Sequence, residues 1–422
     1  MASVTRLPVA PRAQPIAATR LPSAPARERT FTYLGLASFA CGLTSGVTLS
    51  LVGDLYLLEV MVALIALQCV LSRGMGKGFV PPVFLSFVAA GVLTFCGYLL
   101  ADLIAANDPW QYLKGWGRVV LLILDCAALM VIAAHGRRNI WWLAVGIGVG
   151  GVLSLAAAGV PLTRWKLGYG EYVTILAVTL IPLLPAFAAT VAIAAFGAGC
   201  VYADYRSLGA ACLAVSAIML WQRMKGGGGR KFVLVAAVAV VTLAAVVTLL
   251  DSTQARYSDR RQQSNVGRYV GLVVAWRAIT ESPLRGYGSW AADERFGRMF
   301  KAEVERLDRT SNRAADARRS LLPHSQILQA WIEGGILGIS FFVLYGWRLP
   351  GAIRWHAMQR KLDPCVPAFL FFLISGCWNL LASPFLGIMR VHVAIAVAVI
   401  AIAASERRAD PGARPRHRTP PG

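Results

Sequence analysis

The chain alternates long apolar runs with short polar breaks over most of its 422 residues. The apolar runs are about 20 residues long, which is the length that an α-helix needs to cross the hydrocarbon core of a bilayer. They are apolar on every face and lack an alternation with a period of two residues, which argues against the strands of a membrane barrel. We therefore predict an all-α integral membrane protein with about 12 transmembrane helices.

Two of the longest apolar runs predict more than one helix each. The run from Phe31 to Leu71 is long enough for two helices, with a hairpin at Gly53-Asp54. The run from Val173 to Ala203 is too long for one straight span, and Pro182 and Pro185 are expected to divide it into two short helices. Other spans are expected at residues 79–105, 119–134, 232–250 and 327–345.

Composition supports this membrane architecture and sets the domain boundaries. Hydrophobic residues make up 57% of the chain and charged residues only 15%, against roughly 25% charged residues in a soluble domain. We predict a polytopic transmembrane domain at residues 31–404, which contains a large polar loop at residues 251–325. Residues 1–30 and 405–422 are rich in Pro and Arg and are expected to be disordered tails. The N-terminal tail lacks the apolar stretch of a signal peptide.

The basic turns predict the orientation of the chain. If the N-terminus is cytoplasmic, five basic segments fall on the cytoplasmic side, as the positive-inside rule requires. They are Arg73–Lys77, Arg137–Arg138, Arg223–Lys231, Arg348–Lys361 and the C-terminal tail. The loop at residues 251–325 then faces the opposite side, because a loop longer than about 60 residues is translocated largely regardless of its charge.

The net charge of +21 comes from 42 basic and 21 acidic residues. A role in binding nucleic acid has little support, because the basic segments are short turns or lie outside the cytoplasm. The loop at residues 251–325 holds many arginines but a single lysine, Lys301. Arginine binds phosphate and carboxylate groups in a bidentate way. The loop arginines therefore serve either surface solubility or phosphate recognition.

Neither the cysteines nor the outer segments predict a metal site. All eight cysteines lie in apolar segments without a CxxC spacing. We interpret them as small core residues and not as disulfide partners or metal ligands. The outer loops contain no Asp-x-Asp motif and no cluster of histidine and carboxylate residues. We expect no metal and no cofactor.

Most of the large loop is predicted to be helical. Two helical stretches are expected at residues 265–280 and 291–307, separated by a proline stop and a tight turn at Ser282–Gly288. Arg268 and Trp276 are eight residues apart, so they lie within about 80° of each other on the first helix.

Two titratable residues follow where the loop returns to the membrane. His324 is the only histidine in the outer polar segments. A neutral histidine at this boundary could act as a general base, and the alternative is a simple interfacial anchor. Glu333, roughly two and a half turns further along, is an intramembrane carboxylate, which is costly without a partner. Arg390 in the last span is its expected partner, and His392 is a similar intramembrane group.

The order of these residues resembles the motif of the O-antigen ligase and O-antigen polymerase superfamily. That motif consists of an arginine, a tryptophan, a Pro-Leu-x-Gly-x-Gly turn, and a helix start with histidine, glutamate and glycines. The corresponding residues between Val266 and Gly338 are Arg268, Trp276, Pro283-Leu284-Arg285-Gly286-Tyr287-Gly288, His324 and Glu333-Gly334-Gly335.

A second, weaker part of the resemblance precedes the loop. The segment Tyr205–Gly209, which contains Arg206, is similar to a Ser-Arg-Gly-like motif that members have after a mid-chain span. It departs from that motif by having Tyr205 before the arginine and Ser207-Leu208 after it. Ser325 also stands where the family often has asparagine. Arg206 is therefore less securely matched than Arg268 and His324.

The resemblance implies a glycosyltransferase similar to the membrane glycosyltransferases of the C type, in the bacterial inner membrane with both termini cytoplasmic. A ligase of this family takes a glycan from undecaprenyl diphosphate on the periplasmic face. It transfers the glycan to a sugar hydroxyl of the lipid A–core oligosaccharide during lipopolysaccharide biosynthesis, without a metal or cofactor. His324 would be the base or the acceptor-positioning group, and Arg206 and Arg268 would hold the diphosphate. Weaker candidates for binding substrate are Arg164, Lys166, Trp276, Arg277 and Arg285.

The chemistry expected of these residues is a single inverting displacement. Guanidinium groups would bind the diphosphate and offset the charge that grows on it as the glycosidic bond breaks. Neutral His324 could take the acceptor proton as the acceptor oxygen attacks the anomeric carbon.

Three alternatives to a ligase stay open at this point. A polymerase that joins repeat units and a protein O-oligosaccharyltransferase share the donor and the motif and differ in the acceptor. A transporter or flippase belongs to another class, and it predicts internal repeats and broken helices around a site in the middle of the membrane. We find no clear repeat, and the polar residues cluster at the outer interface.

Overall fold

The computed structural model describes residues 33–50, 53–105, 108–224, 266–291, 293–307, 323–359, 363–385 and 387–409. Within these ranges the predicted all-α class is confirmed, since nearly every element is a helix. The predicted tail at residues 1–30, most of the predicted C-terminal tail and the span expected at residues 232–250 lie outside the described residues.

Among the described residues, five helices are long and apolar enough to cross a membrane, which identifies a membrane protein. They are α3 (Pro81–Ala105), α4 (Pro109–Ala134), α5 (Arg137–Ala157), α13 (Cys365–Ala382) and α14 (Met389–Ala409). A sixth span results if α11 (Gln326–Gly338) and α12 (Ser340–Met358) count as one bent span. The finer number of about 12 spans stays a prediction.

The N-terminal run forms two helices joined by a hairpin, as predicted. Helix α1 (Tyr33–Leu43) is followed by the 3-10 turn η1 (Thr44–Gly46), and α2 (Leu57–Arg73) follows the hairpin. The hairpin consists of the antiparallel strands β1 (Thr48–Ser50) and β2 (Asp54–Tyr56), with Ser50 opposite Asp54. Glu59 accepts a hydrogen bond from the backbone N–H of Tyr56 and so caps α2.

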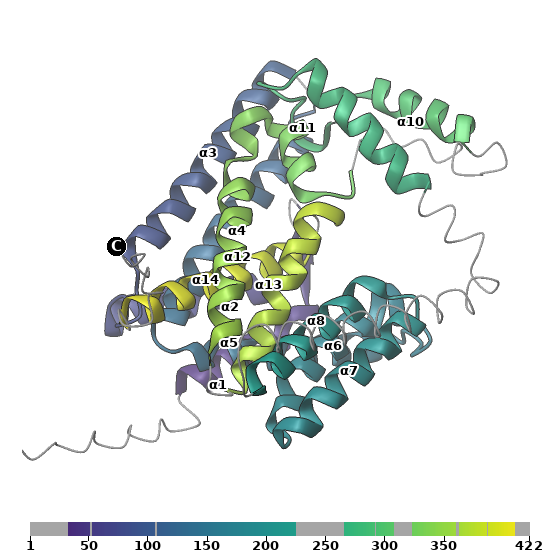
Figure 1. Cartoon of the computed structure of the whole chain (residues 1–422). Coiled ribbons are helices and arrows are strands. Elements are labelled where there is room, and N and C mark those ends of the chain that lie inside the picture. Colours follow the sequence, from purple (N-terminus) through teal and green to yellow (C-terminus); the bar gives the residue numbers. More distant parts are fainter. Residues whose placement is uncertain are drawn as a thin grey trace, which may run out of the picture.

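Helices α6 to α8 form a group at the lower right of Figure 1. The group consists of η2 (Trp165–Tyr169), α6 (Gly170–Leu180), η3 (Ile181–Leu183), α7 (Ala186–Tyr202) and α8 (Arg206–Arg223). The predicted division by prolines is confirmed, because Pro182 lies in the short turn η3 and Pro185 directly precedes α7.

The helical stretches of the large loop are confirmed where they are described. A helix at residues 266–281 is followed by the turn η4 (Ser289–Ala291) and by α10 (Glu294–Leu307). Both helices lie at the upper right of Figure 1, beside α11. One face of α10 buries Phe296 and Val304 in a small apolar cluster with Val270 and Val274. Ile332 of α11 belongs to the same cluster, so the loop helices pack on this helix.

The span expected at residues 327–345 is helical but consists of two helices and not one. Helices α11 and α12 meet at a bend of 112°. Gly335 near the end of α11 has φ 62° and ψ −155°, a backbone conformation open almost only to glycine. Helix α11 then packs closely on α3, because a Cβ atom at Gly97 would lie 2.6 Å from the carbonyl oxygen of Gly334. The bend places the end of α11 where the turn at residues 282–288 meets it.

Six of the eight cysteines are buried. Cys41 and Cys126 belong to the apolar core between the spans. This placement agrees with the interpretation of the cysteines as small core residues.

Candidate functional site

The turn at Ser282–Gly288 is held to α11 by backbone hydrogen bonds. The N–H groups of Tyr287 and Gly288 donate to the carbonyl oxygens of Ile332 and Glu333 at 2.7 and 2.9 Å. In the other direction, the N–H of Ile336 donates to the carbonyl oxygen of Leu284 at 3.1 Å. These bonds satisfy backbone groups that the bend in α11 leaves free. We call this paired region, residues 282–288 with residues 331–336, the interlock.

Two glycines make the interlock possible. Gly286 has φ 70°, and a Cβ atom there would lie 2.6 Å from the backbone nitrogen of Gly335. A Cβ atom at Gly335 would lie 2.1 Å from the carbonyl oxygen of Leu284. The two backbones therefore touch where each has a positive φ, and no side chain fits between them. The indole N–H of Trp331 adds a hydrogen bond to the carbonyl oxygen of Pro283 at 2.8 Å.

Beneath the interlock lies a buried ion pair between Glu333 and Arg118. Arg118 lies in α4 and is 4% exposed, and Glu333 is 0% exposed. The guanidinium also lies 4.6 Å from the ring centroid of Trp290 and donates to the carbonyl oxygen of Phe385 at 3.2 Å. A charge removed from water is tolerated only with partners of this kind. The pair fixes the middle of α11 to α4.

The prediction that Arg390 is the partner of Glu333 is wrong. Arg390 instead makes a bidentate contact with Glu59 of α2, at 2.9 and 3.0 Å. It also donates to the carbonyl oxygen of Asp54 in the hairpin at 2.8 Å. His392, two residues nearer the C-terminus, lies 3.1 Å from Glu171 of α6. Each intramembrane charge has a partner, as expected, but the partners come from other helices.

A second carboxylate, Asp102 in α3, holds the segment after the interlock. Its two oxygens accept from the backbone N–H and the hydroxyl of Ser289 at 2.5 and 2.6 Å. The indole N–H of Trp116 donates to the same carboxylate at 2.7 Å. The next residue, Trp290, has φ 67°, which turns its indole toward Arg118. The loop segment therefore contacts α3, α4 and α11 together.

Sequence reasoning missed Asp102 and Arg118. Asp102 lies within the span predicted at residues 79–105, where a lone carboxylate is costly and indicates a partner. Arg118 directly precedes the span expected at residues 119–134 and so falls outside it. Helix α4 begins earlier, at Pro109, so Arg118 lies in its third turn. For both residues, a charged side chain in an apolar helix without an evident partner nearby in the sequence could have indicated a buried contact.

His324 is exposed and lies just before α11. The next residue, Ser325, is the N-cap of the helix. Its hydroxyl accepts from the N–H of Leu328 at 3.4 Å and donates to the carbonyl oxygen of Leu380 at 3.1 Å. Gln329 then bridges Glu333 and the N–H of Phe385, at 3.0 and 2.8 Å. A buried helix start, held by the hydrogen bonds of Ser325 and Gln329, thus supports the exposed imidazole.

Arg268 and Trp276 lie on the exposed side of the helix at residues 266–281. Arg277 is already committed to an ion pair with Glu303 of α10 at 2.9 Å, and it joins the two helices of the loop. Arg285 donates to the hydroxyl of Ser282 at 3.3 Å inside the turn, so its nearest role is to stabilise that turn. Of these four predicted residues, Arg268 and Trp276 have exposed side chains. Within the described part of the chain, Arg268 is not held in an ion pair of the kind that Arg277 makes.

The interlock has a polar outer edge at Tyr287. Its hydroxyl donates to Glu281 at 3.3 Å, and the guanidinium of Arg295 lies 5.6 Å from its ring centroid. Partial burial and the neighbouring Glu281 raise the pKa of Tyr287, so the phenol stays protonated at neutral pH. A hydrogen bond to Asp293 raises the pKa of Arg295. This edge is therefore neutral at Tyr287 and cationic at Arg295.

Lys166 and Arg206 meet at one carboxylate. The ammonium of Lys166 and the Nε of Arg206 lie 3.3 and 3.5 Å from different oxygens of Asp204. Arg164 is exposed and precedes Lys166 in the same turn. The three residues expected to be catalytic thus come from three segments, since Arg206 begins α8, Arg268 lies in the loop helix and His324 precedes α11. Their catalytic roles stay predictions.

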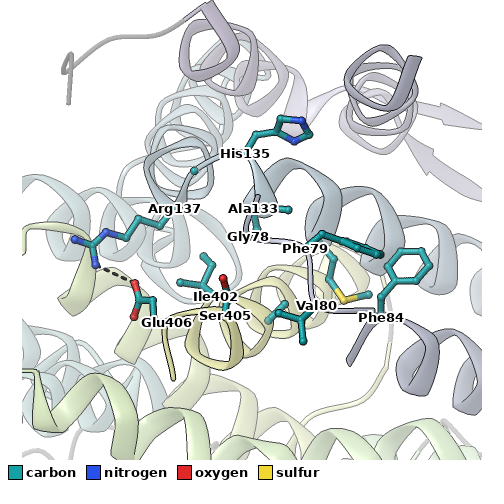
Figure 2. Close-up of a pocket in the computed structure, with 14 residues that line it drawn as sticks. Gly78, Phe79, Val80, Phe84, Ala133, His135, Arg137, Ile402, Ser405 and Glu406 are labelled. Atoms are coloured by element: carbon teal, nitrogen blue, oxygen red, sulfur yellow. Dashed lines mark hydrogen bonds and ion pairs between the residues drawn. The ribbon is translucent and has the colours of Figure 1, made fainter. Parts of the chain in front are cut away.

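A cavity of about 400 Å³ lies at the opposite end of α3 and α4 (Figure 2). It is lined by apolar residues such as Phe79, Phe84 and Ile402, and Arg137 and Glu406 form an ion pair at its rim at 3.1 Å. Arg118, which contacts the interlock, lies about 24 Å from the cavity end of α4, counted at 1.5 Å per residue. The cavity is therefore separate from the loop residues and does not mark their site.

The described residues contain no group of three or more His, Cys, Asp or Glu side chains that could hold a metal ion. The arginine and lysine side chains described above are cationic groups that could bind an anionic substrate. The expectation that no metal or cofactor takes part stays a prediction.

The O-antigen ligase family model matches residues 189–343 of the chain. The matched range contains Arg206, Arg268, His324 and the whole interlock, and it excludes Arg164 and Lys166. No curated protein matches the chain. The match supports assignment to the O-antigen ligase superfamily, and the resemblance based on the loop motif is thereby confirmed.

Proposed function

Because the chain is assigned to the O-antigen ligase superfamily, an enzyme group with ligase- or polymerase-type activity, we propose that it is an O-antigen ligase. It transfers a glycan from undecaprenyl diphosphate to a sugar hydroxyl of the lipid A–core oligosaccharide. The reaction takes place on the periplasmic face of the bacterial inner membrane. The chain acts as an inverting glycosyltransferase that needs no metal ion.

The observation that carries this proposal is the support given to His324. The exposed imidazole directly precedes a buried helix start that Ser325 and Gln329 tie to Leu380 and Phe385 by hydrogen bonds. The same helix carries the interlock and the buried Glu333. A rigid base with an accessible proton-accepting group is what general-base catalysis needs.

In the proposed reaction, His324 accepts the proton of the acceptor hydroxyl. The acceptor oxygen attacks the anomeric carbon while the bond to the diphosphate oxygen breaks, so the configuration inverts. Arg268 and Arg206 bind the leaving diphosphate and stabilise its growing negative charge. Two arginines can bind the diphosphate in place of a metal ion, because each guanidinium can bind two phosphate oxygens at once.

The polymerase and the protein-directed transferase remain the nearest alternatives. They share the donor and the proposed site and differ in the acceptor. The family match does not separate them, so the acceptor decides the matter. A transporter or flippase is the more remote alternative, and it predicts movement of lipid-linked glycan without any transfer.

The test is transfer in vitro. The purified full-length chain is placed in lipid nanodiscs with undecaprenyl diphosphate-linked glycan, lipid A–core acceptor and EDTA, and the products are separated by gel electrophoresis and mass spectrometry. We expect glycan-extended lipid A–core with wild type and a loss of at least about 100-fold in rate for His324→Ala, the low end for a general base. Arg268→Ala is expected to be similarly impaired.

Arg298→Ala is the matched control, because Arg298 is an exposed loop arginine with only a surface contact to Glu294. It is expected to keep full activity. If the donor glycan is lengthened instead, the chain is a polymerase. If His324→Ala transfers at the wild-type rate, the proposed mechanism is wrong. Glycan movement without any transfer product would identify a transporter.

A further inference from the structure

The cluster of Lys166, Asp204 and Arg206 has no counterpart in the family motif, which supplies only the arginine. Lys166 comes from η2, between α5 and α6, and the other two residues come from the junction of α7 and α8. Each oxygen of the Asp204 carboxylate contacts one cation, at 3.3 Å for Lys166 and 3.5 Å for Arg206. Two positive charges from separate segments therefore converge on a single anionic group.

The backbone holds this carboxylate in place. Asp204 has φ 61°, an uncommon value for a residue other than glycine. The N–H groups of Asp204 and Tyr205 donate to the carbonyl oxygens of Val201 and Cys200 at 3.0 and 2.8 Å, which ends α7. The junction is thus a closed turn, and the carboxylate lies beside the first residue of α8.

The start of α8 adds to the attraction for anions. Arg206 is the first residue of this 18-residue helix, and its N-cap, Tyr205, makes no side-chain capping hydrogen bond. A helix N-terminus carries a partial positive charge and unpaired N–H groups. The Lys166 and Arg206 side chains therefore converge beside a helix N-terminus that also attracts anions.

The cluster is accessible, unlike the other intramembrane ion pairs. The side chains of Lys166, Asp204 and Arg206 are 34%, 15% and 43% exposed. One carboxylate leaves a net charge of +1 on the three groups, and the exposed Arg164 lies in the same turn as Lys166. A phosphate group offers the same pair of anionic oxygens with greater charge and can take the position of the carboxylate.

We propose that Lys166 and Arg206 together form an anion site for the diphosphate of the lipid-linked donor, and that Asp204 is an internal counter-ion that occupies the site until the diphosphate displaces it. The assignment of the anion to the donor rests on the proposed function. Lys166 thereby becomes a third cation, beside Arg206 and Arg268, that binds the donor. Asp204 is a positioning residue that sets the affinity of the site.

The proposal predicts whether Asp204→Asn strengthens or weakens anion binding. If Asp204 competes with the diphosphate, Asp204→Asn tightens anion binding. If Asp204 only orients the two cations, the same change weakens it. A surface ion pair is worth little, so we expect Asp204→Asn to lower the Kd by about two- to five-fold. Lys166→Gln removes a charged contact and is expected to raise the Kd by about ten-fold.

The experiment is isothermal titration calorimetry of the full-length chain in nanodiscs with inorganic pyrophosphate at low ionic strength. Lys301→Gln is the matched control, because Lys301 is an exposed loop lysine with a weak contact to Glu305. It is expected to leave the Kd unchanged. Thermal unfolding of each variant confirms that the chain is folded. A double variant, Lys166→Gln with Asp204→Asn, is expected to lose most of the gain seen with Asp204→Asn alone.

The anion site is overturned if Lys166→Gln binds pyrophosphate like wild type, and the counter-ion role is overturned if Asp204→Asn binds it equally or more weakly. Undecaprenyl diphosphate added to the nanodiscs should compete with pyrophosphate. A lack of competition would show that free phosphate compounds, and not the lipid donor, are the ligand. Because no transfer is measured, this result stands or falls separately from the ligase activity.

Discussion

Two ion-pair clusters in this molecule use the same kinds of side chain in opposite surroundings. Arg118 and Glu333 are almost fully enclosed between α4 and α11, with Trp290 and Phe385 around them. Lys166, Asp204 and Arg206 lie at helix ends, where water reaches all three side chains. An enclosed charge cannot leave its partner without a large desolvation cost, whereas an exposed charge exchanges partners readily. The first cluster therefore fixes structure, and the second is suited to bind a ligand.

The largest effect is expected from breaking the enclosed pair. Glu333→Gln leaves Arg118 buried without a countercharge, which costs about 3–5 kcal/mol of stability. The measurement is reversible unfolding in mixed micelles, with wild type and variant compared at the same detergent fraction. Glu305→Gln, which removes an exposed loop carboxylate, is the control and should change little. If both variants unfold like wild type, the enclosed pair is no more structural than an exposed one.

A smaller effect is expected from the glycine that places Glu333. Gly335→Ala forces an alanine into a backbone conformation that costs about 1–3 kcal/mol, and its Cβ atom would meet the carbonyl oxygen of Leu284. We expect a lower unfolding midpoint and a loss of transfer, since α11 also carries the start that supports His324. Gly271→Ala is the control, because a Cβ atom there meets nothing within 4 Å and the residue lies in a helix.

An unchanged stability for Gly335→Ala would mean that the interlock is loose and that the ion pair alone places α11. A stability gain for Gly271→Ala of up to about 1 kcal/mol is the expected outcome for a glycine in a helix interior. The two glycine variants thus separate a position that needs a positive φ from one that does not.

The smallest effect is expected from a partly exposed pair in the large loop, in which the buried Glu303 also contacts Arg306. Arg277→Ala removes the contact with Glu303, in which the arginine side chain is 52% exposed. Such a pair contributes less than about 1 kcal/mol, and salt screens it. Unfolding is measured at low and high ionic strength, and the difference from wild type should shrink at high salt. A salt-independent loss of stability as large as that of Glu333→Gln would contradict the distinction between enclosed and exposed pairs.

Local elements were predictable from the sequence, because their causes are local. Pro182 and Pro185 divide an apolar run wherever it lies in the fold, and the proline stop after residue 281 ends a helix in the same way. The family motif also named the turn at residues 282–288 and Glu333 before any contact was known. Length and hydropathy were sufficient to predict a membrane protein, but not to give the number of spans.

Pairings between distant segments were not predictable in this way. Nothing in the sequence around Glu333 indicates Arg118, which lies 215 residues earlier and outside the span expected at residues 119–134. Arg390 was an equally reasonable partner by charge and depth, but in the fold it contacts Glu59 of α2. The meeting of Lys166 with Asp204 depends likewise on how α5, α7 and α8 come together. Periodicity carries no information about such contacts.

The interlock has a consequence for how this region can change over evolutionary time. Its hydrogen bonds, apart from the one that the Trp331 indole donates, join backbone atoms, so the exposed side chain of Arg285 does not determine the fit. Substitutions at Arg285 are compatible with the position of α11, whereas a Cβ atom at Gly286 would meet the backbone of Gly335 and a Cβ atom at Gly335 would meet that of Leu284. This explains why the motif leaves the positions of Arg285 and Tyr287 open and demands glycine beside them. The fit between the two halves therefore depends on the course of the main chain and on the two glycines that let the backbones touch.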